Sequence, residues 1–367
     1  MPTFQHCLRF SGLGKDQSRD SKHSIDIMKK VFILMAVVAM CFTACAQRKG
    51  EQRGPRQGGG MKPNEQREQS QAGLGSAESR ESKSGTQINK ESDSTFVALK
   101  NETLAKFKQF TFEDAETGKT MEYNLLVPEG YDETKSFPLV LFMADASTVG
   151  KDVTAPLTQG YGALEFASDR DQAAHPSFVL VPQYTEWAVQ DDWSTTDEVE
   201  MTIRLLRAVC KEYKVDTNRL YTTGQSMGGM MSFYFNITHP DLFAASLFVS
   251  SQWDTSKMKD FGKKHFFYIV AGGDQKASGG MRDLAEVLKG QNAKVDSASW
   301  SAKLPQAEQE RLAEELIAKG GNINFIKWEA GSVLPETGRA MEHMASFDYG
   351  YKIAAVRDWL FKQHKEK

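Results

Sequence analysis

The most informative stretch of this chain reads Arg219-Leu220-Tyr221-Thr222-Thr223-Gly224-Gln225-Ser226-Met227-Gly228-Gly229. Its first half is rich in aromatic and β-branched residues, which favour a strand, and the apolar segment that follows it, residues 227–237, is typical of a helix. Between them, Gly-x-Ser-x-Gly predicts a sharp turn with Ser226 at its tip. We expect Gly224 and Gly228 at places where this turn packs too closely for a larger side chain.

A serine in such a turn has the setting of a nucleophile. It sits at the N-terminus of a helix, where backbone N–H groups can stabilise an oxyanion. It also needs a base that removes its proton, and an acid that orients the base. In strand–turn–helix sites of this kind the three groups follow one another in the order Ser, acid, His. The sequence therefore predicts acyl transfer, with the acid and the base after residue 226.

Three histidines between Ser226 and the C-terminal tail are candidates for the base: His239, His265 and His343. His239 stands where a helix is expected to stop, and His265 opens a predicted strand. His343 is expected in a loop just before the last helix, at the carboxyl edge of the sheet and beside the serine. We therefore predict that His343 is the base, with an isolated surface histidine as the alternative.

Asp274 is the predicted acid. It follows Gly272 and Gly273 directly after an apolar run at 266–271, which should place it at the same sheet edge. Asp283 is expected in a helical segment, facing solvent, and Asp296 in a polar loop. If Asp274 is the acid, its carboxylate should lie within about 3.2 Å of His343, a hydrogen-bond distance. Otherwise it is a turn or helix-capping residue.

Apolar runs bounded by turn residues recur through the later part of the chain, with helical patterns between them. Strands are expected at 121–128, 137–143, 178–181, 220–223, 243–249 and 266–271, and helices at 198–213, 227–237, 306–319 and 351–361. This alternation predicts an α/β fold with a doubly wound, mostly parallel sheet. Residues 275–320 are polar and long for a connection, and we expect them to shape a rim or lid.

The first 95 residues have a different character. Met28-Lys29-Lys30 precedes an uncharged apolar run at 31–42, which is too short to span a bilayer and is typical of a signal peptide. The run ends in Phe42-Thr43-Ala44-Cys45, which resembles a bacterial lipobox with Cys45 as the lipidated residue. An ordinary signal peptide or a short anchor is the alternative. The expected location is the bacterial cell envelope, on the periplasmic or outer-membrane face, held to the membrane by lipid.

These features divide the chain into four parts. Residues 1–27 are expected to be an extension before the true start at Met28, and residues 28–45 the signal peptide. Residues 46–95 are rich in Gln, Gly, Ser and charged residues and are predicted to form a disordered tether. Residues 96–367 form the predicted catalytic domain, in which Cys210 is the single cysteine and is expected to be a small buried helix residue.

Composition narrows the class of protein further. The chain has 367 residues and a formal net charge of −3, which gives no sign of a nucleic-acid partner. No His/Cys cluster has the spacing of a metal site. The predicted chemistry needs neither a metal nor an organic cofactor.

Residues 213–229 resemble the corresponding segment of the poly(3-hydroxybutyrate) depolymerase, feruloyl esterase and predicted peptidase group of α/β-hydrolases. Three further stretches are similar to that group, and the resemblance covers about residues 108–365. It implies an α/β-hydrolase fold and a serine carboxylic-ester hydrolase that works through an acyl-enzyme. The three stretches are 123–128 with Gly130-Tyr131, 181–183 with Trp193, and 358–360.

The chain departs from that group in one loop. Ala144-Asp145 stands where the family usually has His-Gly, after the strand at 137–143, in the loop that supplies one oxyanion donor. Asp tolerates fewer backbone angles than Gly, so the geometry of this loop matters. We expect Met227 and Ala146 to be the donors. A serine peptidase of the same fold, and a lipid-anchored binding protein without activity, remain alternative functions.

Overall fold

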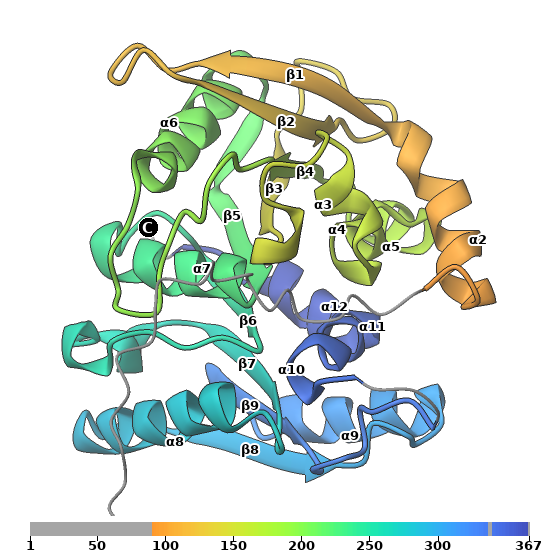
Figure 1. Ribbon diagram of the computed structural model, residues 1–367, viewed down its shortest axis with the longest axis vertical. Helices are drawn as coiled ribbons and strands as arrows, with labels where there is room; N and C mark the ends of the chain where they lie inside the picture. The colour runs from red at the N-terminus through yellow and green to blue at the C-terminus, as the bar shows by residue number, and fades with distance from the viewer. Residues whose placement is uncertain (1–89, 337–339, 366–367) are drawn as a thin grey trace, which may run out of the picture. The chain divides into compact units, whose positions relative to one another are not determined.

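A nine-stranded sheet runs through the computed structural model, which describes residues 90–336 and 340–365 (Figure 1). The strand order is β1-β2-β4-β3-β5-β6-β7-β9-β8. The pairs β1–β2 and β2–β4 are antiparallel, and the other pairs are parallel. The predicted doubly wound, mostly parallel sheet is therefore confirmed. The strands are β1 (Phe107–Glu113), β2 (Thr120–Leu126), β3 (Phe137–Met143), β4 (Phe178–Pro182), β5 (Val215–Gln225), β6 (Ala245–Val249), β7 (Phe266–Ala271), β8 (Val295–Trp300) and β9 (Ile323–Trp328).

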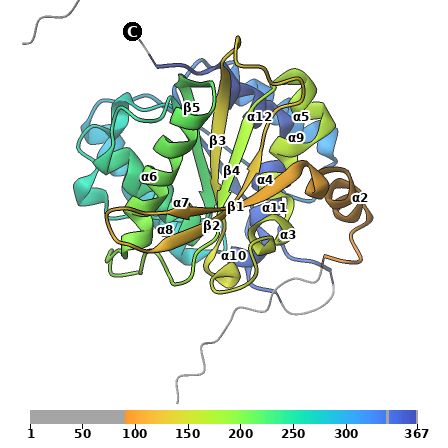
Figure 2. The same ribbon diagram turned by 90° about the horizontal axis from the view of Figure 1, so that it is seen from above.

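Helices cover both faces of this sheet, as the view in Figure 2 shows. One face carries α6 (Asp197–Glu212), α7 (Met227–Thr238) and α8 (Gln275–Gly290). The opposite face carries α4 (Tyr161–Ala167), α5 (Asp169–Ala174), α9 (Gln306–Ile317), α11 (Phe347–Lys352) and α12 (Ala354–Lys362). Three shorter or peripheral helices complete the described part: α2 (Ser94–Thr103), α3 (Ala155–Thr158) and α10 (Glu342–Ala345).

The central strand β3 shows why the apolar runs of the sequence are continuous. Leu139, Leu141 and Met143 pack into the core beneath α6, α7 and α8. Val140 and Phe142 alternate with them and pack into the second core, beneath α4 and α12. Because helices cover both faces, every position of the strand after Phe137 is buried, as expected of a strand at the centre of a parallel sheet.

The prediction of a lid at 275–320 is wrong, and of this segment only the start of α8 borders the cavity in front of Ser226, through Lys276. This segment forms α8, the edge strand β8 and α9, all of them part of the sheet and its helical layers. Asp296, expected in a loop, is buried in β8. The sequence of β8 is too polar to predict a strand, and the strand exists because it pairs in register with β9 from Val295 to Trp300.

Two predicted boundaries also need correction. The folded part begins before residue 96, since Lys90 Nζ donates to Gln159 O at 2.9 Å and Asp93 caps α2 through its side chain. The expected single helix at 351–361 is two helices, α11 and α12, separated at Ile353, where the backbone is extended. Cys45 and the predicted signal peptide lie outside the described residues. No helix within the described ranges has the length and apolarity needed to cross a membrane.

Candidate active site

Ser226 lies at a strained turn between β5 and α7. β5 ends at Gln225 and α7 begins at Met227, so the serine is the single residue between them. Its φ of 51° and ψ of −117° lie outside the regions that L-residues ordinarily adopt. The backbone N–H of Ser226 donates to Val249 O of β6 at 3.1 Å, which ties the turn to the sheet. This strain is typical of a functional position held by its surroundings.

Two glycines allow the turn to pack, as the sequence predicts. A Cβ on Gly224 would lie 2.4 Å from the carbonyl carbon of Gly228. A Cβ on Gly228 would lie 2.0 Å from the carbonyl oxygen of Met143, at the end of β3. The obstacle is backbone in both cases, of α7 for Gly224 and of β3 for Gly228, and it cannot move aside as a side chain would. The tip of the turn is therefore fixed against β3.

Asp274, His343 and Ser226 form a continuous hydrogen-bonded chain. His343 Nε2 lies 2.8 Å from Ser226 Oγ, and His343 Nδ1 lies 2.6 Å from Asp274 Oδ2. The predicted distance between His343 and Asp274 is therefore confirmed. Asp274 is also the N-cap of α8, because its Oδ1 accepts from Ala277 N at 3.2 Å. Its two carboxylate oxygens thus serve two separate contacts.

The other candidates for base and acid have different surroundings. His239 Nε2 lies 3.1 Å from Glu200 Oε2, and His265 Nδ1 lies 2.8 Å from Gln363 Oε1. Asp283 is exposed on α8, as predicted. Asp296 is buried in β8, where an ion pair with a lysine involves its carboxylate.

The sequence predicts His343 in a loop, but the residue lies in the short helix α10. Ser346 Oγ donates to the backbone carbonyl oxygen of His343 at 2.8 Å. The same hydroxyl lies 2.5 Å from the hydroxyl of Ser250, and both serines are buried. Ser250 directly follows β6, so this pair of hydroxyls connects the histidine backbone to the sheet. Neither serine is predicted from the sequence, since no local pattern relates Ser250 to residues about 90 positions further along the chain.

The two expected oxyanion donors are placed at the starts of helical turns. Met227 is the first residue of α7, and Ala146 is the first residue of a 3₁₀ turn at Ala146–Thr148. Backbone N–H groups at such positions have no acceptor within their own helix, so they are free to point at a ligand. Both residues line the same cavity as Ser226.

The Ala144-Asp145 loop is regular despite its departure from the family pattern. Asp145 has an extended backbone, with φ of −78° and ψ of 172°, which any residue adopts. Its buried carboxylate accepts from Ser147 N at 2.5 Å and so caps the 3₁₀ turn that begins at Ala146. The substitution for His-Gly therefore introduces no left-handed backbone at this position.

A cavity of about 340 Å³ opens in front of Ser226 and His343. Two exposed apolar side chains stand on its rim, Trp187 and Met341, which are 50% and 52% exposed. Asp191 and Lys276 also line it and form an ion pair with each other. No pattern in the sequence predicts a role for these four residues. Trp187, an apolar residue in the polar segment after β4, is a hint of a binding role, but its position in the sequence does not indicate what it contacts.

Beneath the acid, Tyr268 of β7 is buried and donates to the carbonyl oxygens of Ser251 and Ala277, the latter at 3.2 Å. Burial raises the pKa of Tyr268 well above its usual value, and the charge of Asp274 adds to this effect. The phenol therefore stays neutral over the whole working pH range. It supports the sheet edge under Asp274 without contributing a charge.

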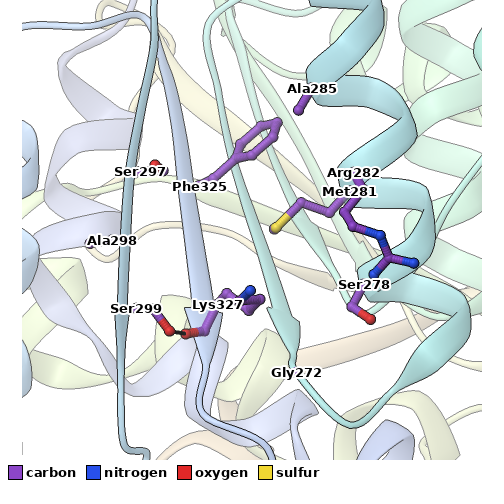
Figure 3. Close-up of a pocket in the computed structure, with 10 residues that line it drawn as sticks. All are labelled: Gly272, Ser278, Met281, Arg282, Ala285, Ser297, Ala298, Ser299, Phe325 and Lys327. Atoms are coloured by element: carbon purple, nitrogen blue, oxygen red, sulfur yellow. Dashed lines mark hydrogen bonds between the residues drawn. The ribbon is translucent and has the colours of Figure 1, made fainter.

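A second cavity, of about 390 Å³, lies between α8 and the strands β8 and β9. Figure 3 shows Met281 and Phe325 pointing into this space from α8 and β9, and Arg282 and Lys327 at its borders. None of the three hydrogen-bonded side chains of the Ser226 chain lines it. This second cavity is slightly larger than the one in front of Ser226. The cavity in front of Ser226 is nevertheless the candidate active site, because the reactive groups converge there.

Comparisons with known proteins found similarity to esterases. A family model described as "Putative esterase" matches residues 115–320. Among solved structures, a thermostable esterase is 25% identical with a TM-score of 0.57, and the match covers 72% of this chain and 64% of that one. The feruloyl esterase module from Clostridium thermocellum is 13% identical, with a TM-score of 0.49 and coverage of 73% and 94%. S-formylglutathione hydrolase from Staphylococcus aureus is 14% identical, with a TM-score of 0.41 and coverage of 70% and 98%.

The search of curated proteins found no match. The chain spans less than two thirds of the length of the thermostable esterase. The family model, in contrast, matches more than half of this chain and includes β2 to α9, with Ser226 and Asp274. On this match and on the topology of its sheet, the chain belongs to that esterase family and has the α/β-hydrolase fold.

Proposed function

We propose that this protein is a carboxylic-ester hydrolase that acts through an acyl-enzyme, with Ser226 as nucleophile, His343 as general base and Asp274 as orienting acid. The observation that carries the proposal is the unbroken hydrogen-bonded chain from Asp274 through His343 to Ser226. It ends at a strained serine in front of an open cavity. Membership of an esterase family supports the choice of an ester over other acyl substrates.

In the proposed first half-reaction, Ser226 Oγ attacks the ester carbonyl carbon while its proton passes to His343 Nε2. The Nδ1–H of His343 donates to Asp274, whose charge stabilises the imidazolium. The N–H groups of Met227 and Ala146 hold the negative oxygen of the tetrahedral intermediate. When this intermediate collapses, the alcohol leaves with the proton from His343 and the acyl group stays on Ser226.

In the second half-reaction, water attacks the acyl-enzyme and gives its proton to His343 Nε2. A second tetrahedral intermediate forms in the same oxyanion site and collapses to the free acid. His343 returns its proton to Ser226 Oγ, and the enzyme is restored. Trp187 and Met341 on the rim favour an ester with an apolar acyl or alcohol group, which would cover both side chains.

The test is hydrolysis of short acyl esters, feruloyl esters and peptide amides by the full-length protein in detergent, with Ser226→Ala and His343→Ala as comparisons. We expect the esters to be cleaved and each variant to lose about 10⁴-fold or more in turnover while its circular dichroism is unchanged. Ordinary turnover by Ser226→Ala would rule out the mechanism. Cleavage of amides in preference to esters would identify a peptidase, and tight binding without turnover would identify a binding protein.

We also propose that Cys45 carries lipid and holds the protein at the bacterial cell envelope. The basic segment, the apolar run and Thr43-Ala44-Cys45 in the sequence support this proposal. Mass spectrometry of the membrane fraction should find an acylated N-terminal peptide that begins at Cys45. An unmodified protein that begins beyond Cys45, or that retains residues 31–42, would show that the segment is not a lipoprotein signal.

A further inference from the structure

Glu342, immediately before His343, connects two loops that leave different strands of the sheet. Its Oε2 accepts a hydrogen bond from the backbone N–H of Gly273 at 2.8 Å, and its Oε1 accepts one from the N–H of Gly331 at 2.7 Å. Gly273 directly precedes Asp274 in the loop after β7, whereas Gly331 belongs to the loop after β9. One carboxylate therefore joins the acid loop, the β9 loop and the histidine segment.

The Glu342 carboxylate occupies the place that a side chain at Gly273 would take. A Cβ on Gly273 would lie 2.0 Å from Glu342 Oε1 and 2.3 Å from its carboxyl carbon. The absence of a side chain is thus what lets the carboxylate reach the Gly273 N–H. Hydrogen bonds from N–H groups to an ionised carboxylate are about twice as strong as those between neutral groups.

The histidine segment needs such anchors, because α10 is only four residues long. Ala345 N donates to Met341 O, and Ser346 N donates to Glu342 O, each at 3.0 Å. A single helical turn has little stability of its own, so tertiary contacts must fix its position. Glu342 supplies two of these contacts at the start of the turn, on the side of the acid loop.

We propose that Glu342 is a positioning residue for the catalytic histidine. By holding the acid loop against the start of α10, it fixes the distance between Asp274 and His343 and keeps His343 Nε2 within reach of Ser226. This inference rests on the proposed function. Glu342 does not line the cavity in front of Ser226, so its loss should impair proton transfer without changing how the ester binds.

Glu342→Gln is the sharpest test, because it preserves size while removing one acceptor. The glutamine amide has one acceptor oxygen, and its NH₂ group can only donate. Whichever way it points, one of the Gly273 and Gly331 N–H groups then faces another donor. For a small ester, we expect kcat to fall by about 10- to 100-fold and KM to stay within about twofold, since a displacement near 1 Å can cost 10²-fold. Glu342→Asp, which keeps both acceptors, should recover part of the loss.

The matched control is Glu329→Gln. Glu329 is exposed in the same loop after β9, and its carboxylate makes no hydrogen bond or ion pair within the described residues. We expect this variant to keep the wild-type kcat and KM. If Glu329→Gln lowers kcat as much as Glu342→Gln does, the effect comes from the general loss of a negative charge, and the positioning role is overturned.

Gly273→Ala approaches the same contact from the other side. The added methyl group would displace the Glu342 carboxylate, so we expect a fall in kcat similar to that of Glu342→Gln. The double variant should be little worse than either single one, because both changes break the same contact. Gly279→Ala on α8 is the control, since its Cβ would meet only Arg282 Nη2 at 3.6 Å.

The inference is overturned if Glu342→Gln keeps the wild-type kcat, or if KM rises in place of the fall in kcat. It is also overturned if Glu342→Gln is partly unfolded at the assay temperature and regains the wild-type kcat when it is assayed at a lower temperature, where it is folded. That result would indicate a merely structural residue. If Ser226→Ala is inactive and Glu342→Gln is normal, only the positioning role fails. If Ser226→Ala hydrolyses esters normally, the proposed function fails and the positioning role fails with it.

Discussion

The turn that carries Ser226 and the segment that carries His343 meet at one hydrogen bond but are held in place by different means. The serine turn is fixed by backbone packing: β5 enters it, α7 leaves it, and Gly228 lies against the Met143 carbonyl. The histidine segment has no strand of its own and is fixed by side-chain hydrogen bonds: the Glu342 carboxylate accepts from two backbone N–H groups, and Ser346 Oγ donates to the His343 carbonyl. Local sequence therefore specifies the turn that carries Ser226, whereas the position of His343 depends on distant partners.

Gly228→Ala should have the largest effect, because it attacks the backbone packing of the serine turn. The added Cβ would lie 2.0 Å from the carbonyl oxygen of Met143, which belongs to the central strand β3. We expect little folded protein, and no measurable esterase activity in what is recovered. The yield of soluble protein and its thermal unfolding curve measure this. A folded, fully active Gly228→Ala variant would show that close backbone packing is not what fixes the serine turn.

Asp274→Asn should be the next most severe change. The asparagine amide can still cap α8, but it no longer offers a charge to the imidazolium, and it favours the wrong tautomer of His343. We expect kcat to fall by about 10³- to 10⁴-fold with thermal stability close to wild type. Unchanged turnover would mean that Asp274 is only a capping residue. Asp283→Asn, an exposed change on the same helix, is the control and should be silent.

Ser346→Ala tests the side-chain anchoring of the histidine from the side of β6. It removes the hydrogen bond to the His343 carbonyl and leaves the buried Ser250 hydroxyl without this partner. We expect a loss of stability of about 1–3 kcal/mol and a fall in kcat of about 3- to 10-fold, smaller than for Glu342→Gln. Urea unfolding and steady-state kinetics at one temperature measure both. An intact kcat would leave Glu342 as the main anchor of α10.

Asp114→Asn should have the smallest effect on activity, because it changes stability far from both regions. Asp114 is buried just after β1 and accepts two hydrogen bonds from Arg204 of α6, at 2.6 and 2.8 Å. We expect the free energy of unfolding to fall by about 1–3 kcal/mol at pH 7, with an unchanged kcat at 25 °C. A parallel loss of kcat would show that lost stability alone can mimic misplacement of His343.

The same pair gives a pH dependence with a definite sign. Hydrogen bonds from Arg204 hold the pKa of Asp114 well below its ordinary value. A carboxyl group whose pKa is lower in the folded state stabilises the fold above its unfolded pKa, near 4, and this contribution is lost as the pH falls further. The stability difference between wild type and Asp114→Asn should therefore be constant near neutral pH and shrink below about pH 4. Urea titrations from pH 7 to pH 3 measure it.

Much of the fold was predictable because its strands are buried on both faces. The run at 137–143 is the strand β3 residue for residue, and 266–271 is β7. The edge strand β8 escaped prediction because it contains Asp296 and serines and owes its existence to β9. The sequence predicts a single final helix because the apolar pattern continues through Ile353, where the backbone is extended and the helix is interrupted. Edge strands and breaks between helices depend on contacts with neighbouring elements, and the hydrophobic periodicity of one segment carries no information about those contacts.

The sequence by itself predicted Ser226 as the nucleophile candidate, the order of the three candidate residues along the chain and the doubly wound sheet. The turn at Ser226 is encoded by the neighbouring residues 219–229, and the sheet by apolar runs that alternate with helical patterns along the chain. Only the tertiary structure shows that Asp274 lies at hydrogen-bond distance from His343 and His343 from Ser226, and that Glu342, Ser346 and Ser250 hold the histidine there. These contacts join positions between about 70 and 120 residues apart, and only the folded sheet brings the carboxyl ends of β5, β6, β7 and β9 together at one edge.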